Sequence, residues 1–416
     1  MGRPVRFIHA ADLHLDAPFG GIDAQDSRVR DALAASTYRA LDALAAACIE
    51  RGADFLVISG DVYNQAERRV RSQLAFAKAA ATLEHAGIPV FVVHGNHDPA
   101  SGWSAGIAMP HNVHVFADDR VERVAYERDG EAVCALYGRS YRRAAETANL
   151  ASGFKREIGD VVAIGVLHTN VGGRPGYDDY APCTLDDLRA AGMDYWALGH
   201  IHKPEVLSQS PYAVYSGCPQ GLDPTQSGPR GCYEVVIDDG TVETTFLPLA
   251  AIEWRYAEVD LSRASRLDDV RDAIAESVDA ALADATTPVI VRLDLTGRCD
   301  VHTPLQTAGA LAAIVDDARD EALGLERWAW IDRVRDRTRP SIDLEALRSA
   351  EDFTGDVIRL ADDLLEDSAQ GHAFVDEVAA TLLDRVGDPG LVPDAPDILA
   401  RARDLALDRL LDGDTR

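Results

Sequence analysis

Short apolar runs alternate with longer amphipathic stretches over the first 250 residues of the chain. The runs VRFIHA (5–10), FLVIS (55–59) and PVFVV (89–93) are rich in β-branched and aromatic residues, so each predicts a buried strand. Between them lie Ala- and Leu-rich stretches, residues 28–52 and 68–87, which each end in a glycine and therefore predict helices. This alternation of strands and helices predicts a layered α/β domain.

The alternation continues towards residue 250 and then changes. The run VVAIGVLH (161–168), the helix-like TLDDLRAAG (184–192) and the run DYWAL (194–198) extend the first pattern. Residues 254–298 then have the pattern of a strand, a helix and a strand, which predicts a second and smaller α/β unit. After Ser341 the pattern predicts helices alone.

We therefore expect three parts: residues 1–250, residues 251–340 and a helical region over residues 341–416. In the helical region apolar residues recur at helical spacing. They are Phe353, Val357, Leu360 and Leu364, followed by Phe374, Val378 and Leu382. Ordinary helix packing explains such a repeat, and so does a docking face for a partner helix.

The composition is that of a globular protein. Hydrophobic residues make up 47% of the 416 positions, and no run of eighteen or more apolar residues predicts a membrane span. The N-terminal residues lead directly into a strand-like segment, which does not fit a signal peptide. The six cysteines have no paired spacing, so we expect free thiols in a reducing cytoplasm.

The chain is strongly acidic, with a formal net charge of −28 from 69 acidic and 41 basic residues. Only three of the basic residues are lysines: Lys78, Lys155 and Lys203. Such a surface indicates a halophilic host, although a GC-rich genome also explains the scarcity of lysine. It repels nucleic-acid phosphates, which complicates any function on DNA. The densest basic segment, RVRDRTRP (333–340), fits a phosphate contact or an ion-paired link to the acidic tail equally well.

Side chains that can bind a metal follow five of the predicted strands. In chain order they are Asp12 and His14, then Asp61, then Asn96 with His97 and Asp98, then His168, and finally His200 and His202. Open α/β sheets gather their sites at the carboxyl ends of strands, so we expect these five loops to converge. A lone histidine after a strand is usually a packed or surface group, but five such loops in succession favour one common site.

The ligand types restrict the metal. Seven candidates, two Asp, one Asn and four His, include no thiolate, which excludes a cysteine-rich structural zinc site. Seven ligands exceed the need of one ion, so two ions about 4 Å apart that share a carboxylate fit better. Mixed imidazole and oxygen donors favour Mn²⁺, with Fe²⁺ or Zn²⁺ as alternatives, over Mg²⁺ or Ca²⁺.

The motifs Asp-X-His, Gly-Asp, Gly-Asn-His-Asp, His and Gly-His-X-His, in this order, resemble those of the calcineurin-like metallophosphoesterases. The flanking segments FIHAADLHLDAPF, DYWALGHIHKPEVL and GPRGCYEV are similar to those of SbcD-type DNA repair exonucleases, and most similar to the YhaO-like branch. The resemblance implies a metallophosphoesterase β-sandwich flanked by helices for residues 1–250. It further implies a small α/β capping domain for residues 251–340 and partner docking by the helical region.

The resemblance also assigns roles to the candidate residues. It places Asp12, His14, Asp61 and His202 around one ion, and Asp61, Asn96, His168 and His200 around the other, so that Asp61 is the bridge. A metal-bound hydroxide would attack the phosphodiester in line. His97 would bind no metal but would assist the leaving group, with Asp98 orienting its ring.

The expected function is a two-metal-dependent DNA phosphodiesterase of DNA repair, an exonuclease whose endonuclease activity is left open. The implied partners are DNA, an SbcC-like coiled-coil ATPase subunit and a second copy of the chain, without a membrane. Two alternatives remain. The same site can act on nucleotides or phosphoproteins, or the metals can brace a scaffold that has no turnover.

Overall fold

The computed structural model describes residues 4–22, 26–64, 69–102, 106–386 and 395–412. By its contacts the chain divides into two compact units. The first comprises Met1–Ala257, Ile274–Leu293 and Val315–Val334, and the second comprises Glu258–Ala273, Asp294–Ile314 and Arg335–Arg416. Because the two units interleave between residues 258 and 334, the division into three domains stays a prediction.

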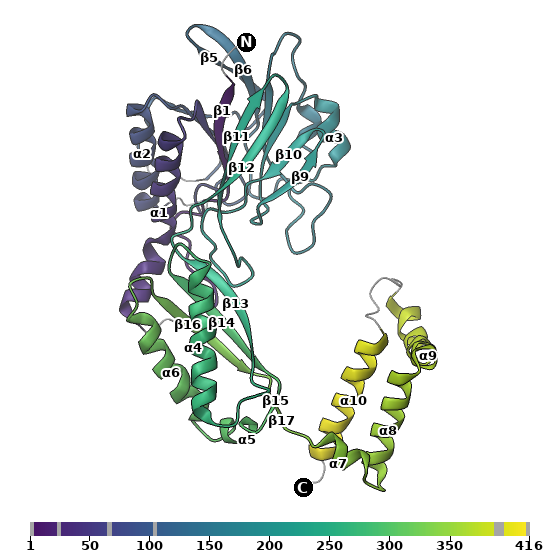
Figure 1. Cartoon of the computed structure of the whole chain (residues 1–416). Coiled ribbons are helices and arrows are strands. Elements are labelled where there is room, and N and C mark those ends of the chain that lie inside the picture. The colour runs from purple at the N-terminus through teal and green to yellow at the C-terminus, as the bar shows by residue number, and fades with distance from the viewer. Residues whose placement is uncertain (1–3, 23–25, 65–68, 103–105, 387–394, 413–416) are drawn as a thin grey trace. The chain divides into compact units, whose positions relative to one another are not determined.

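Two six-stranded sheets form the body of the first unit (Figure 1). The first sheet has the order β12 (Thr241–Pro248), β11 (Gly231–Asp238), β1 (Val5–Ala10), β2 (Phe55–Ser59), β3 (Val90–Val93) and β4 (Val113–Val115). The second has the order β5 (Glu122–Arg128), β6 (Glu131–Gly138), β7 (Ala163–His168), β8 (Tyr195–Gly199), β10 (Tyr212–Tyr215) and β9 (Glu205–Gln209). The strands β1 to β4 run parallel to one another, as do β6, β7, β8 and β10. In each sheet the carboxyl ends of these strands therefore lie on the same side.

An apolar core joins the inner faces of the two sheets. Phe7 of β1 stacks on Phe55 of β2 with ring centroids 5.0 Å apart, and it meets Tyr195 of β8 edge-on at 5.4 Å. A polar link crosses the same core, because Nδ1 of His9 lies 2.9 Å from the Tyr195 hydroxyl. Burial lowers the pKa of His9 to about 3, so this histidine is a neutral packing group.

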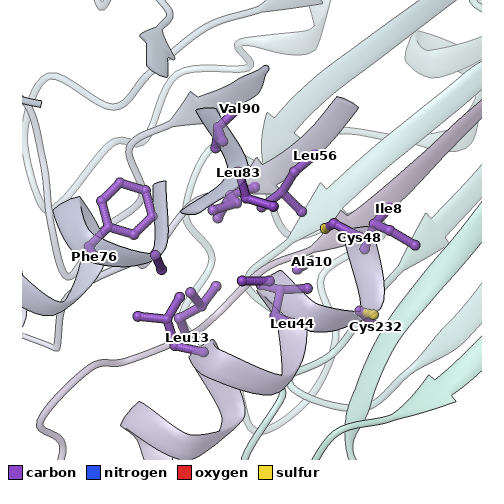
Figure 2. Packing of buried hydrophobic residues seen from close by; sticks show 14 of the residues in the cluster. Ile8, Ala10, Leu13, Leu44, Cys48, Leu56, Phe76, Leu83, Val90 and Cys232 are labelled. Carbon is purple, nitrogen blue, oxygen red and sulfur yellow. The ribbon is translucent and has the colours of Figure 1, made fainter. Parts of the chain in front are cut away.

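Helices cover the outer faces. Apolar side chains of α1 (Ser27–Glu50) and α2 (Val70–His85) pack on the first sheet; Figure 2 shows Leu44, Cys48, Phe76 and Leu83 beside Ile8, Leu56 and Val90. On the second sheet, Leu188 of α3 (Leu185–Ala191) packs in one cluster with Trp196 of β8. The predicted layered sandwich flanked by helices is confirmed.

Helix α1 is long and apolar enough, by length and composition, to cross a membrane. It contributes Leu41, Leu44 and Cys48 to the buried cluster on the first sheet. This packing makes α1 a core helix of the sandwich.

Beyond residue 250 the chain continues with further strands and helices, among them the predicted strand, helix and strand over residues 254–298. The strands β13 (Glu253–Asp260), β14 (Val289–Thr296) and β16 (Ala329–Asp336) form one sheet in that order, connected through α4 (Leu267–Ala283), α5 (His302–Leu305) and α6 (Ala310–Leu323). Two short strands, β15 (Arg298–Cys299) after β14 and β17 (Arg339–Pro340) after β16, pair in parallel with each other. Within the basic segment, Arg337 pairs with Asp294 of β14 at 3.1 Å.

The C-terminal region is helical, as predicted: α7 (Leu344–Arg348), α8 (Phe353–Glu366), α9 (Ser368–Val386) and α10 (Ala395–Asp412). Its small core contains Val375 and Leu399. Four members of the predicted apolar repeat are instead 46–69% exposed: Phe353, Leu360, Phe374 and Val378. The side chain of Leu382 lies outside the described residues. These four side chains therefore lie outside the small core of the helical region.

The glycine in β7 gives a test of the sandwich packing. A Cβ added at Gly165 would lie 2.5 Å from Cε3 of the Trp196 ring, so we expect Gly165→Ala to lower the free energy of unfolding by about 1–3 kcal/mol. At exposed Gly20 the nearest atom would be 3.5 Å away, and Gly20→Ala should change it by less than about 0.5 kcal/mol. Urea denaturation measures both, and equal stability of the two variants would contradict the tight packing.

Candidate metal centre

The seven predicted ligands come together where strands of both sheets end. Ligand atoms lie within 4.8 Å of one another in three overlapping groups: Asp12, His14 and His202; His14, Asp61 and His97; and Asp12, Asp61 and His168. The remaining two candidates join through hydrogen bonds. Oδ1 of Asn96 lies 2.9 Å from Nε2 of His168, and the backbone N–H of His200 donates to the Asp12 carboxylate at 3.1 Å. The His200 ring lies 5.2 Å from the His168 ring between centroids, but its Nε2 is 2.8 Å from the Asp178 carbonyl oxygen, which leaves Nδ1 as the nitrogen for a metal.

Four of these residues have a left-handed backbone, which non-glycine residues rarely adopt. The φ angles are 53° at Asp12, 44° at His14, 54° at Asp61 and 97° at His200. Such conformations cost about 1–3 kcal/mol each and persist only where the surroundings enforce them. Here the N–H of Asp12 donates to the Gly60 carbonyl and that of His14 to the Asp61 carbonyl, both at 3.0 Å. The loop after β1 and the loop after β2 are therefore fixed to each other by backbone hydrogen bonds.

Three of the five polar motifs are preceded by a glycine, which permits a close approach. A Cβ at Gly95 would lie 2.3 Å from Oδ1 of Asp61, and one at Gly60 would lie 2.3 Å from Nδ1 of His168. At Gly199 it would lie 2.0 Å from the Ser59 carbonyl oxygen. No side chain fits at these three positions, so the Gly-Asp, Gly-Asn and Gly-His pairs are steric requirements of the cluster.

Around His168 the structure brings acceptor atoms together. Nδ1 of His168 lies 2.8 Å from the Ser59 carbonyl, which only accepts, so this nitrogen donates and Nε2 of the neutral ring carries the lone pair. Nε2 faces Oδ1 of Asn96 at 2.9 Å and Oδ2 of Asp61 at 3.4 Å, and both oxygens accept. Three acceptors that face one another require a proton or a cation between them, so the donor set fits a divalent metal.

A second convergence lies beside the first. Nε2 of His14 is 3.1 Å from Nε2 of His202 and 3.9 Å from Oδ2 of Asp61. The side-chain amide nitrogen of Gln226 lies 2.8 Å from Nδ1 of His202 and so fixes that ring. Asp61 therefore reaches both groups of ligands, which is the position expected of a bridging carboxylate.

Burial and charge set the protonation of the cluster. Burial lowers the pKa of His200 and of His202 to about 4, so both rings are neutral near pH 7 and have a lone pair for a metal. Burial, reinforced by the Asp61 charge, raises the pKa of Asp12 to about 7. Burial opposes the charge of His168, yet Asp61 and Asp12 outweigh it and raise the pKa of His168 to about 9. A proton on His168 thus occupies the position that a cation would otherwise fill.

His97 differs from the ligands because its ring is exposed. Its backbone N–H donates to Oδ1 of Asp61 at 2.9 Å, and Nδ1 lies 2.9 Å from the Asn64 carbonyl oxygen. The carbonyl makes Nδ1 the donor and leaves Nε2 free to face a substrate.

The role expected for Asp98 needs correction. Its buried carboxylate accepts from the N–H groups of Val62 and Gly95, each at 2.8 Å, and so ties the loop after β2 to the loop after β3. At the His97 ring the Asn64 carbonyl holds the position that was expected for Asp98.

A cavity of about 1430 Å³ lies beside the cluster and includes Asp61, Asn96, His97, His200 and His202 in its wall. The wall also contains five residues that the metal-binding motifs did not predict: Arg174, Tyr177, Lys203, Gln226 and Arg230. The Tyr177 hydroxyl accepts from the N–H of His202 at 3.2 Å. Lys203 directly follows the last histidine of the motif, and this position was the only sequence signal for a place in the cavity wall among the five residues. The other four lie on loops without a metal-binding pattern.

The comparisons with known proteins agree with this geometry. Residues 5–204 match the sequence profile of the calcineurin-like phosphoesterases, and residues 254–339 match that of the middle domain of metallophosphoesterase YhaO. The chain is 33% identical over 342 residues to an uncharacterized metallophosphoesterase YhaO of Bacillus subtilis, which covers 82% of this chain and 84% of the relative.

More distant relatives are named as a DNA double-strand break repair protein and as a nuclease subunit. A DNA double-strand break repair protein Mre11 of Thermoplasma acidophilum is 24% identical, covering 72% of this chain and 79% of the relative. One subunit of the nuclease SbcCD of Bacillus subtilis is also 24% identical, covering 64% of this chain and 76% of the relative. From its motifs, its metal-ligand cluster and the extent of the similarity to YhaO, the chain belongs to the calcineurin-like metallophosphoesterases, a family of phosphoester hydrolases that bind divalent metals.

Proposed function

We propose that the chain is a two-metal-dependent DNA phosphodiesterase of DNA repair that acts as an exonuclease. The observation that supports this most is the convergence of seven nitrogen and oxygen ligands beside a cavity of about 1430 Å³. Sites for small molecules usually enclose about 300–1,000 Å³, so this cavity suits a polymeric substrate better. The names of the Mre11 and SbcCD relatives support DNA as that polymer.

Each part of the site has a separate task in this proposal. Two divalent cations held by the seven ligands, Mn²⁺ in preference to Fe²⁺ or Zn²⁺, would polarise the phosphate and lower the pKa of a bound water. Asp61 holds the two groups of ligands in register. Burial keeps the rings of His14, His200 and His202 neutral so that they can bind, whereas a metal would have to displace the proton of His168. His97 has its ring fixed through Nδ1, which donates to the Asn64 carbonyl. When the ring carries a second proton on Nε2, that proton can pass to the leaving oxygen of the substrate and leaves the ring neutral.

The helical region supplies a surface for a partner. The exposed side chains Phe353 and Leu360 lie on α8, and Phe374 and Val378 lie on α9. An SbcC-like coiled-coil ATPase subunit is the partner we propose for this face, because helices bind apolar stripes of this kind and a relative is named as one subunit of a nuclease. A homodimer and a cytoplasmic location complete the proposal; the six free, buried cysteines agree with a reducing compartment.

Replacement of the bridging carboxylate tests the metal centre. We expect Asp61→Asn to lower the metal content from two ions per chain to one or none and to reduce hydrolysis at least about 100-fold, since a neutral amide cannot bridge two cations. Elemental analysis after saturation with Mn²⁺ measures the ions. Exposed Asp179 provides the control, and Asp179→Asn should retain both. Fewer than two ions in the unmodified protein would contradict the proposal.

The role of His97 is tested by removing its ring while the ligands stay in place. We expect His97→Ala to keep both ions and to lose about 10²–10⁴-fold in the rate of nucleotide release from an end-labelled duplex with Mn²⁺. The control is His111→Ala, which removes an exposed imidazole outside the cavity wall. Loss of metal in His97→Ala would make His97 a ligand instead. Hydrolysis of small phosphodiesters alone by the unmodified protein would favour nucleotides as substrates, and no turnover at all would favour a scaffold.

A further inference from the structure

Three basic side chains line the cavity, and they differ in how their charges are used. Arg230 is 5% exposed, and its guanidinium donates to the carbonyl oxygens of His202 at 2.6 Å and Gln226 at 3.1 Å. Arg174 forms a two-point ion pair with Glu205, with Nη2 2.9 Å from Oε1. Lys203 is exposed and makes no hydrogen bond or ion pair with any residue that the structure describes. It is therefore the one uncommitted cation among the described residues of this wall.

The backbone that carries Lys203 is nevertheless fixed. The carbonyl of the preceding His202 accepts from the N–H of Cys218 at 3.2 Å as well as from Arg230. Gly217, which precedes Cys218, lies so close that a Cβ there would be 2.7 Å from the His202 oxygen and from the nitrogen of Pro204. The start of the lysine side chain is thus held one residue away from a metal-ligand candidate, while its ammonium group is free to move in the cavity.

Two acidic residues, Glu205 beside the wall and Asp223 within it, form no ion pair with Lys203. The pKa of Glu205 is lowered mainly by its ion pair with Arg174 and to a smaller extent by the charge of Lys203. Glu205 is already paired with Arg174 through both oxygens. Oδ1 of Asp223 accepts from the N–H of Thr225 at 2.8 Å, within its own loop. A ligand that meets the free ammonium must then be an anion, and it must lie beside the metal cluster rather than on it.

Building on the proposed phosphodiesterase function, we infer that Lys203 binds a backbone phosphate next to the scissile one and so selects polynucleotides over isolated phosphoesters. One phosphate occurs about every 3.4 Å along the axis of a DNA strand, so a phosphate held at the metals brings its neighbours within reach of the flexible lysine stem. A mononucleotide or a phosphoprotein has no second phosphodiester at this spacing. Local binding by one free cation also reconciles a DNA substrate with a chain of net charge −28.

The scarcity of lysine allows a charge-matched test. Lys203→Ala and Lys155→Ala each remove one ammonium group, but exposed Lys155 lies outside the cavity wall. For an oligonucleotide duplex with Mn²⁺, we expect Lys203→Ala to raise KM about five- to tenfold, with a smaller effect on kcat, because the contact lies away from the reacting atoms. The slope of log KM against log salt should fall by about 0.9, the value for one lost phosphate contact.

Two further measurements make the outcome decisive. Lys203→Arg keeps the charge, so its slope of log KM against log salt should be close to that of the unmodified protein. The ratio of kcat/KM for duplex to kcat/KM for bis-p-nitrophenyl phosphate should fall in Lys203→Ala but not in Lys155→Ala. If the unmodified protein degrades duplex but Lys203→Ala and Lys155→Ala have the same salt slope, the inference is wrong and the nuclease proposal stands. If the unmodified protein hydrolyses only the small diester, both proposals fail.

Discussion

Asp61, Asn96 and His168 turn acceptor atoms towards one another in a buried space, and this arrangement requires a cation or a proton between them. Much of the surrounding structure enforces this unfavourable approach. The Ser59 carbonyl fixes the His168 ring at 2.8 Å, and the adjacent glycine positions leave no room for a side chain. The left-handed residues after β1, β2 and β8 are a further part of the same constraint. These close contacts and left-handed residues of the fold are thus gathered where the metals are expected.

The sequence predicted the parts of the fold in which local pattern and burial agree. Strands β1, β2, β3, β7 and β8 are buried on both faces, so their apolar runs are continuous, and the ligands follow them directly. The outer strands were missed because they are partly exposed: β5 and β12 have few buried residues. The turn Asp129-Gly130, with φ of 55° and 82°, was a usable hairpin signal between β5 and β6 that the apolar pattern did not include.

The candidate site divides in the same way. Ligand candidates follow from side-chain type and motif order, and five of the seven have ligand atoms in the groups that could hold a metal, with Asn96 and His200 beside them. The partner of the His97 ring could not be predicted, because the Asn64 carbonyl is a backbone group without a side-chain signature. The family resemblance placed Asp98 beside that ring, yet its buried carboxylate satisfies N–H groups of two loops that are adjacent only in the folded chain. Tertiary hydrogen bonds of this kind leave no periodic trace in a sequence.

The ligands come from both halves of the sandwich: Asp12, His14, Asp61 and Asn96 follow strands of the first sheet, and His168, His200 and His202 follow or end strands of the second. Ions bound there would link the two sheets, in addition to the apolar core that already joins them. Ligand binding to the native state adds to stability in proportion to the logarithm of ligand concentration. The lifetime of the protein against cellular proteases would then depend on the supply of metal in the cell. Shortage of that metal would lower the amount of folded protein as well as its activity.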